Sequence, residues 1–291
     1  MTAANLGFIG VGKMGEPMVL RLLGGGHRVT VFNRSREKLA KVCDAGACAA
    51  GSPREVAAVA DIIFLCLTDA SAVEAVVFGA DGVAEGAGQG TLLVDCSSIS
   101  PAATRAMAAR WQEACGGRWV DAPVSGGVPG AQQGTLIFLA GGDPADIGRI
   151  RPFLDVMGRQ ATHMGPVGSG QMTKLCNQAI VACNLATIAE AVHLAAAGGV
   201  DAGRLAEALR GGFADSAPLQ VYGPRMAGAA TGPAMGALAT MLKDMTNVLD
   251  QAHALGAPMP MTSAAAELYR IVAGRGYLDA DLDNLVRLFD P

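Results

Sequence analysis

The fold is decided by the stretch Leu6-Gly7-Phe8-Ile9-Gly10-Val11-Gly12-Lys13-Met14-Gly15, in which an apolar run leads straight into a G-x-G-x-x-G pattern. The run predicts a strand and the residues after it predict a helix, which is the context in which this pattern forms a phosphate-binding turn. Gly10 permits the tight turn, Gly12 leaves room for a pyrophosphate, and Gly15 lets helix and strand pack closely. A purely structural glycine turn is the alternative, and the position between strand and helix argues against it.

Short apolar runs and helical segments alternate through the first half of the chain. Such alternation predicts a parallel sheet with helices on both faces, here a doubly wound, Rossmann-like α/β domain over residues 1–164. The six expected strands are Leu6–Gly10, Val29–Asn33, Ile62–Leu67, Thr91–Asp95, Arg118–Ala122 and Thr135–Ala140.

The pattern changes at Ser169, where a long apolar helix runs to about Gly198 and ends in a glycine pair. Its apolar residues lie nearly all round, so we expect burial on several sides. Further helices are expected at 201–210, 218–227, 234–255, 260–274 and 279–289. The long helix would join the α/β domain to an all-helical domain over residues 165–291, with ligands in a cleft where the two domains meet.

Composition and charge exclude several classes of protein. The 291 residues are enough for two domains, and the net charge of −4 argues against a nucleic-acid partner. The seven cysteines contain no C-x-x-C pair and the four histidines are scattered, so we expect free thiols in a reducing cytosol and no metal site. No secretory pattern opens the sequence, and Asn, Glu or His interrupts each apolar stretch before it reaches membrane-spanning length. A soluble cytoplasmic protein is predicted.

The end of the second strand, Val31-Phe32-Asn33-Arg34-Ser35, bears on the choice between NAD and NADP. An NAD-selective site usually has Asp or Glu here to bind the ribose hydroxyls, whereas Arg34 with Ser35 beside it suits a 2′-phosphate. NADP is therefore favoured over NAD, and the alternative is that Arg34 is an ordinary surface charge. After the fourth strand, Ser98 is placed to touch the nicotinamide or its ribose, and Ser100 is placed to cap the next helix.

Two further segments carry candidate chemistry. In Ser125-Gly126-Gly127, a serine before two glycines exposes backbone N–H groups that can bind a carboxylate, although a plain glycine turn is the commoner alternative. Lys174 lies near the start of the long apolar helix, where the helix dipole and burial both favour its neutral amine. Such a lysine suits proton transfer, the alternative being a side chain that extends to solvent. Asn177 lies one helical turn further and can orient a substrate hydroxyl.

These motifs together resemble the β-hydroxyacid dehydrogenases of the 3-hydroxyisobutyrate dehydrogenase and tartronate semialdehyde reductase type. The resemblance covers Gly7–Gly15, Asp95–Pro101, Asp121–Gly134, Gly168–Gln178 and Leu242-Lys243-Asp244. It implies that Lys174 is the general acid/base, that Ser125, Gly126, Gly127 and Asn177 hold the substrate, and that the protein is a homodimer or homotetramer. The cofactor-binding residues that it implies are Gly10, Val11, Gly12, Lys13, Met14, Gly15, Asn33, Arg34, Ser35, Leu67, Thr68, Ser98 and Lys243.

The sequence departs from the family pattern at two places. Gln178 stands where many members have Asn, although the reductase-like members share Asn-Gln. Thr68 stands where Leu-Pro is frequent, so the loop over the pyrophosphate is expected to differ. The Asn33-Arg34-Ser35 segment resembles the NADP-using members.

The resemblance implies an NAD(P)-dependent oxidoreductase that interconverts a small 3-hydroxy acid and its semialdehyde or oxo acid. Tartronate, methylmalonate and succinate semialdehydes and glyoxylate all stay open as substrates, and Phe213–Ser216 and Tyr222–Met226 are candidates for recognising the substrate's far side. Imine reduction is disfavoured because relatives with that activity usually have another residue at the position of Lys174. A 6-phosphogluconate dehydrogenase is disfavoured because Gln171 stands where His is expected. A non-catalytic NADP-binding module is the alternative outside enzymes, and it predicts loss of the proton-transfer residue.

Overall fold

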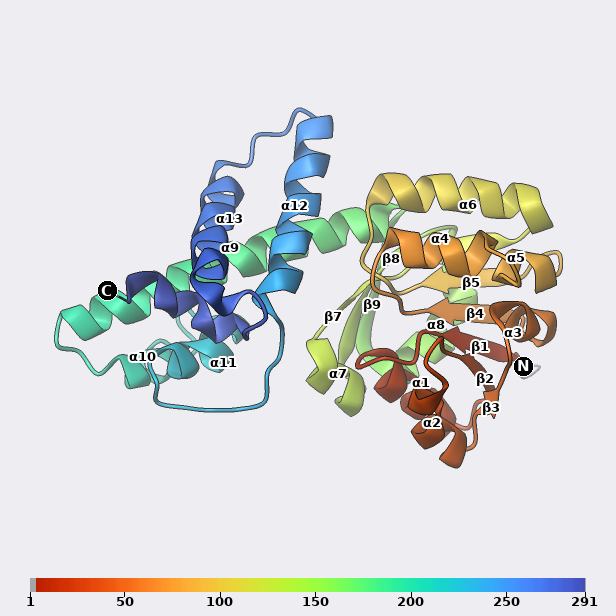
Figure 1. Cartoon of the computed structure of the whole chain (residues 1–291), viewed down its shortest axis with the longest axis horizontal. Coiled ribbons are helices and arrows are strands. Elements are labelled where there is room, and N and C mark those ends of the chain that lie inside the picture. The colour runs from red at the N-terminus through yellow and green to blue at the C-terminus, as the bar shows by residue number, and fades with distance from the viewer. Residues whose placement is uncertain (1–3, 291) are drawn as a thin grey trace. The chain divides into compact units, whose positions relative to one another are not determined.

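The computed structural model describes residues 4–290 and divides into two compact units, one ending at Lys174 and the other beginning at Leu175. The first unit is built on one sheet with the strand order β3-β2-β1-β4-β5-β6-β8-β7, and β9 pairs with β8 (Figure 1). The strands are β1 Leu6–Ile9, β2 Val29–Phe32, β3 Cys48–Ala49, β4 Ile62–Leu65, β5 Leu92–Asp95, β6 Arg118–Asp121, β7 Val124–Ser125, β8 Leu136–Gly141 and β9 Gly158–Gly165.

The first six strands of this order run parallel, and β8 runs antiparallel to β6 and β7. The strand order reverses between β1 and β4, which is the switch point where doubly wound sheets bind ligands beyond the carboxyl ends of their strands. The six strands expected from the sequence are confirmed. The sequence missed β3 and β7 because two residues are too few for a pattern, and it missed β9 because most of that strand is polar.

Helices cover both faces of the sheet, as expected. Figure 1 shows α3, α4, α5 and α6 on one face and α1, α2, α7 and α8 on the other. The helical segments of this unit are α1 Gly15–Gly24, η1 Arg36–Leu39, α2 Ala40–Asp44, α3 Pro53–Val59, α4 Ala70–Phe78, α5 Val83–Gly86, α6 Pro101–Cys115, α7 Gly127–Gln133, α8 Pro144–Met157 and the start of α9 Ser169–Ala197.

Alternate residues of each buried strand supply two separate cores. In β4, Ile62 and Phe64 join the core beneath α1 and α8, whereas Ile63 and Leu65 join the core that contains Trp111 of α6. Side chains of successive strand residues point to opposite faces, so a continuous apolar run is what a strand covered on both sides requires. These two cores fix the sheet, and with it the carboxyl edge on which the candidate site is built.

The second unit is helical and has its own core around Tyr269, Leu185 and Met245. Its helical segments after α9 are η2 Ala202–Arg204, α10 Leu205–Ala208, α11 Ala217–Met226, α12 Leu238–Ala254, α13 Pro260–Val272, η3 Ala273–Tyr277 and η4 Leu282–Phe289. The helix expected at 234–255 begins only at Leu238. Residues before it are not helical because Asp281 accepts the N–H groups of Met235 and Gly236 at 3.1 and 2.8 Å.

Helix α9 is long and apolar enough to cross a membrane, by length and composition alone, a test that the core helix of a soluble protein also passes. Ala182, Leu185 and Ala189 of α9 are buried in the core of the second unit, so we interpret it as a core helix. The expectation of burial on several sides was too broad, because Ile180 and Leu194 are 68% and 73% exposed in the single chain. The domain boundary after residue 164 and the homo-oligomer stay predictions.

Candidate active site

The glycine turn between β1 and α1 leaves open space at one glycine and none at the other two. Gly10 has a φ of +101°, and a Cβ there would lie 2.3 Å from the carbonyl oxygen of Cys66. A Cβ on Gly15 would lie 2.0 Å from the carbonyl oxygen of Gly10. A Cβ on Gly12 would meet no atom within 4 Å. Packing therefore requires glycine at positions 10 and 15. Gly12 instead faces open space, in which the pyrophosphate of a ligand can approach the protein backbone closely.

Asn33 fastens this turn to the end of β2. Its Oδ1 accepts the N–H of Val11 at 3.0 Å, and its Nδ2 donates to the carbonyl oxygen of Ser35 at 2.9 Å. An amide can accept and donate at once, whereas an ionised carboxylate only accepts. The neutral residue at this position is thus matched to the two backbone groups that it joins.

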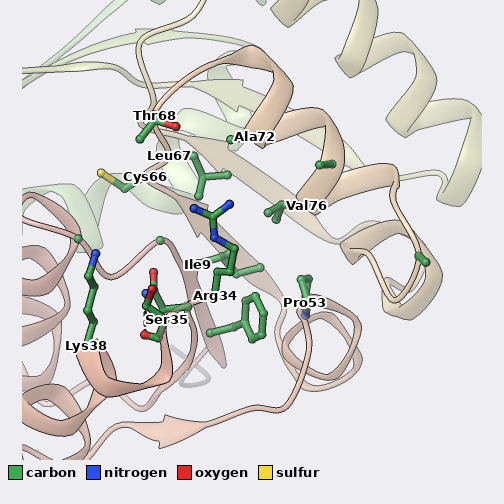
Figure 2. A pocket seen from close by; sticks show the side chains of 16 residues that line it. Ile9, Arg34, Ser35, Lys38, Pro53, Cys66, Leu67, Thr68, Ala72 and Val76 are labelled. Carbon is green, nitrogen blue, oxygen red and sulfur yellow. Dashed lines mark hydrogen bonds between the residues drawn. The ribbon is translucent and has the colours of Figure 1, made fainter. Parts of the chain in front are cut away.

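A cavity of about 460 Å³ opens beside the turn. Figure 2 shows the Arg34 side chain extending among the lining residues toward Leu67, with Ser35 and Lys38 also in the lining. The other lining residues are Ile9, Gly10, Gly12, Phe32, Asn33, Pro53, Cys66, Thr68, Ala72, Ala75, Val76 and Ala80. Two cations, open space at Gly12 and an apolar wall fit a nucleotide that carries phosphate groups.

The structure brings seven of the expected cofactor residues into this lining, whereas Lys243 belongs to the second unit. Lys13 is exposed, and Val11 and Gly15 are buried in the turn. Ser98 is partly buried in the loop after β5. In that loop, the Oγ of Ser100 accepts the N–H of Ala103, which confirms the helix cap. The expected cofactor residues that line the cavity are Gly10, Gly12, Asn33, Arg34, Ser35, Leu67 and Thr68.

Two buried carboxyl groups lie side by side at the carboxyl ends of β5 and β6. Asp95 and Asp121 are register partners in the sheet, and neither is exposed. Burial raises the pKa of Asp95 to about 7, and the side chain of Ser97, together with the Ser97 N–H that donates to Oδ1 at 2.9 Å, opposes part of that rise. Its Oδ2 has no hydrogen-bond partner among the described residues. Burial also raises the pKa of Asp121, although the N–H groups of Gly168 and Gln171 oppose the rise.

Ser125 comes four residues after the end of β6, and two glycines follow it. Ser125 is the last residue of β7 and pairs with Ile137 of β8. Gly126 and Gly127 have φ values of +124° and +61°, are exposed, and lead into α7. Two successive residues with positive φ need glycine, so the local conformation, and not only the absence of side chains, explains the Ser-Gly-Gly sequence.

Lys174 and Asn177 lie on the first turns of α9. Lys174 is the sixth residue of the helix, is partly buried, and belongs to the same unit as the cavity and Ser125. In the second unit, the Nδ2 of Asn177 donates to Gln178, whose Nε2 donates to the buried Asp244 at 2.6 Å. The Nζ of Lys243 lies 3.5 Å from the other Asp244 oxygen. Gln178, a departure from the usual Asn, thus joins Asn177 to Asp244. The loop residue Phe213 is fully exposed.

Sequence reasoning missed Lys38, Asp95, Asp121 and the bonds made by Gln171. Lys38 follows Arg34 by four residues, and the two cations close together in sequence could have suggested a second positive charge in the pocket. Asp95 and Asp121 end buried strands, and an acid in such a place is a signal that requires an explanation. Gln171 carried no signal, because its partners are backbone groups of a distant loop.

Two family models match the chain. Residues 5–165 match the NAD-binding domain of 6-phosphogluconate dehydrogenase, and residues 168–289 match the NAD-binding domain of NADP-dependent 3-hydroxyisobutyrate dehydrogenase. Among curated proteins, 2-hydroxy-3-oxopropionate reductase of Escherichia coli is 38% identical over 98% of this chain and 97% of its own. The NAD-dependent L-serine dehydrogenase of Pseudomonas aeruginosa is 36% identical over 99% and 98%.

Solved structures resemble the whole chain as well. The 3-hydroxyisobutyrate dehydrogenase of Mycobacterium tuberculosis, solved with L-serine, has a TM-score of 0.88 at 30% identity and covers all of both chains. An imine reductase of Streptomyces aurantiacus has a TM-score of 0.65 at 23% identity over 99% of this chain and 100% of its own, which shows the fold alone.

A pair of alanine variants separates packing from ligand approach in the glycine turn. Gly15→Ala should lower the free energy of unfolding by about 1–3 kcal/mol, because its Cβ would collide with the backbone of Gly10. Gly12→Ala should change that free energy by less than about 1 kcal/mol, since its Cβ has room, but should weaken NADPH binding about tenfold or more. Urea unfolding and NADPH fluorescence titration measure both. Unchanged NADPH affinity in the folded Gly12→Ala protein would contradict a phosphate site at this turn.

Asp95→Asn tests the buried acid through pH. The pKa of Asp95 is higher in the folded state, at about 7, than the ordinary 3.8, so the folded state retains the proton more strongly. The stability that this proton provides is present at low pH and is lost as the pH rises from about 4 through 7. Asn mimics the protonated acid, so its stability relative to the native protein should increase between pH 5 and pH 8. Urea unfolding at both pH values measures this, and a difference that stays constant would refute it.

Proposed function

The chain belongs to the β-hydroxyacid dehydrogenase family of nicotinamide-dependent oxidoreductases, and from this premise we propose that it interconverts a small 3-hydroxy acid and its semialdehyde with NADP. The observation that carries the proposal is the placement of Lys174. It lies on the second turn of a helix whose start is bound to the carboxyl end of β6, the strand from which the Ser125 turn also departs. The proposed proton-transfer group and the proposed carboxylate-binding turn are thus both attached to the carboxyl edge of the sheet, beyond which the nucleotide pocket lies.

Lys174 is the proposed general acid/base. In reduction its ammonium donates a proton to the carbonyl oxygen of the semialdehyde, and in oxidation its neutral amine accepts the proton of the hydroxyl group. The nicotinamide, when bound, supplies or accepts the hydride. The oxidation rate should therefore rise with pH, because the amine must first be neutral.

Ser125, Gly126 and Gly127 are the proposed carboxylate site. The Ser125 hydroxyl and the backbone N–H groups of the two exposed glycines can donate to the carboxylate oxygens. Holding the carboxylate orients the reacting carbon, an effect that can lower a barrier by about 7–11 kcal/mol in well-aligned cases. Asn177, one turn after Lys174, is the proposed partner of the substrate hydroxyl, and Lys243 is proposed to help bind the cofactor.

Arg34 and Lys38 support a preference for NADP. Both cations line the nucleotide pocket, and no carboxylate is among the lining residues. A 2′-phosphate adds negative charge to the ribose, which cations bind and an Asp or Glu would repel. The relative from Pseudomonas aeruginosa is named as NAD-dependent, so the preference must be measured on this chain.

The substrate class has one specific second candidate. One relative is named L-serine dehydrogenase, and one similar structure holds L-serine. L-Serine is itself a 3-hydroxy acid with a carboxylate, so the same turn and the same lysine would serve it. We place the reduction of 2-hydroxy-3-oxopropionate (tartronate semialdehyde) first, because the reductase of that substrate is the more similar of the two curated relatives. The protein is expected to act in the cytoplasm.

Kinetics on a panel of substrates tests the proposal. NADPH oxidation is followed with tartronate, methylmalonate and succinate semialdehydes and glyoxylate, and NADP reduction with L-serine. Lys174→Ala should lower kcat about 100-fold or more on the best substrate while the Kd of NADPH stays the same. Lys41→Ala, which removes an exposed lysine paired with Glu16, is the matched control and should keep native kcat. Near-native turnover of the Lys174→Ala protein would exclude this lysine as the proton donor.

Arg34→Ala tests the cofactor preference. Loss of the guanidinium should weaken NADPH binding about 10-fold or more, because a charge-assisted hydrogen bond contributes about 1.5–3 kcal/mol. NADH lacks the 2′-phosphate, so its affinity should change much less. Fluorescence titration with both cofactors measures the ratio. Equal weakening for NADPH and NADH would contradict a 2′-phosphate contact at this position.

A further inference from the structure

The start of α9 is capped by a carboxylate that comes from the sheet. The Oδ1 of Asp121 accepts the N–H of Gly168 at 2.7 Å, and its Oδ2 accepts the N–H of Gln171 at 2.8 Å. The first N–H groups of a helix have no partner within the helix, and an anion at that end also interacts favourably with the helix dipole. Helices usually take such a cap from the residue directly before them. Here the capping residue, Asp121, precedes Gly168 by 47 residues and Gln171 by 50 residues, so the cap fixes the start of α9 to β6.

The backbone of α9 approaches the sheet without intervening side chains. A Cβ on Gly170 would lie 2.2 Å from the carbonyl oxygen of Leu139 in β8, and a Cβ on Gly141 would lie 2.7 Å from the nitrogen of Gly170. Both distances are much shorter than a van der Waals contact, so neither position can hold a side chain. The first turn of α9 therefore lies directly on β8, and it has no room to move closer to the sheet.

Gln171 makes a second attachment. Its side chain is 1% exposed, its Nε2 donates to the carbonyl oxygen of Ser97 at 2.8 Å, and its Oε1 accepts the N–H of Ile99 at 3.2 Å. The Oγ of Ser97 in turn accepts the N–H of Leu67 at 2.9 Å. Because Leu67 lines the nucleotide pocket, a continuous series of hydrogen bonds joins that pocket to the first turn of α9.

Lys174 follows Gln171 by three residues. Residues three apart lie on neighbouring positions of one helix face, so the two attachments fix the helix one turn before the amine. A rotation or shift of the first turn would carry the lysine with it. A misplacement of about 1 Å in a catalytic group can lower a rate about 100-fold.

We propose that Asp121 and Gln171 are positioning residues that fix the position of Lys174 relative to the nucleotide pocket. The inference rests on the proposed function of Lys174 and adds two residues to that function. Both act through hydrogen bonds to backbone groups of the chain, Asp121 on α9 itself and Gln171 on the loop after β5.

Two variants and a matched control test the proposal. Asp121→Asn places an amide N–H₂ against a backbone N–H, and Gln171→Met keeps the side-chain length but removes both hydrogen bonds. Asp143→Asn is the control, because Asp143 caps α8 by accepting the N–H of Ala145 at 2.8 Å, and α8 carries no candidate site residue. The best substrate of the panel and NADPH are used with each full-length protein.

The expected result is a split between turnover and binding. For Asp121→Asn and Gln171→Met, kcat should fall about 10- to 100-fold, whereas the KM of the substrate and the Kd of NADPH should stay within about threefold. Hydrogen exchange provides a readout without activity: amides of residues 168–174 should exchange faster in both variants, and those of α8 should not. Asp143→Asn should keep native kcat.

Several outcomes would overturn the inference. Folded variants with native kcat would do so, as would variants in which NADPH affinity falls in step with kcat, because the two residues would then act on the pocket alone. If Asp121→Asn does not fold, Gln171→Met decides. If neither folds, Gln171→Asn decides, since it keeps an uncharged amide but is one methylene shorter, so it cannot bond Ser97 and Ile99 as Gln171 does. A native protein inactive on the whole panel would refute the proposed function, and this role with it. An active native protein with unaffected variants would refute the positioning role alone.

Discussion

A helix that begins inside a protein must find partners for its first N–H groups, and α9 finds them in a carboxylate at the end of β6. These hydrogen bonds between Asp121 and the start of α9 fix the first turn of the helix on the sheet. The glycines at positions 141 and 170 follow from this attachment, because only they allow the backbones to come so close. The sheet edge that holds the nucleotide pocket therefore also sets the place of Lys174.

Two neighbouring acids at that edge have different environments. Asp121 has N–H donors on both oxygens, and these donors offset part of the rise in its pKa that burial causes. Asp95 has the N–H of Ser97 on one oxygen, and its pKa of about 7 reflects burial with less compensation. Two ionised carboxylates side by side would repel each other, and the negative charge of Asp121 is one of the causes, after burial, that raise the pKa of Asp95.

Much of this arrangement could be predicted from the sequence, for physical reasons. The glycine turn, the six main strands and α9 leave local signals, because tight turns need glycine and buried strands and helices need apolar residues in characteristic patterns. Short or exposed strands such as β7 and β9 leave weak signals, and the start of α12 depends on Asp281, which follows it by more than forty residues. The attachments made by Asp121 and Gln171 join backbone groups to side chains far away in sequence. No local pattern contains such pairs, so only the folded chain displays them.

The amide of Asn33 limits how cofactor choice could change during evolution. Replacement by Asp, the usual route to an NAD-selective ribose site, would remove the donor to the carbonyl oxygen of Ser35 and place two acceptors against each other. The glycine turn, whose Val11 N–H the same side chain holds, would lose part of its support. A lineage that exchanges one dinucleotide for the other is thus expected to alter residues 34 and 38 first and to retain the amide. A substitution at position 33 would therefore change both the cofactor selectivity and the geometry of the glycine turn. Substitutions at positions 34 and 38 could change the selectivity alone.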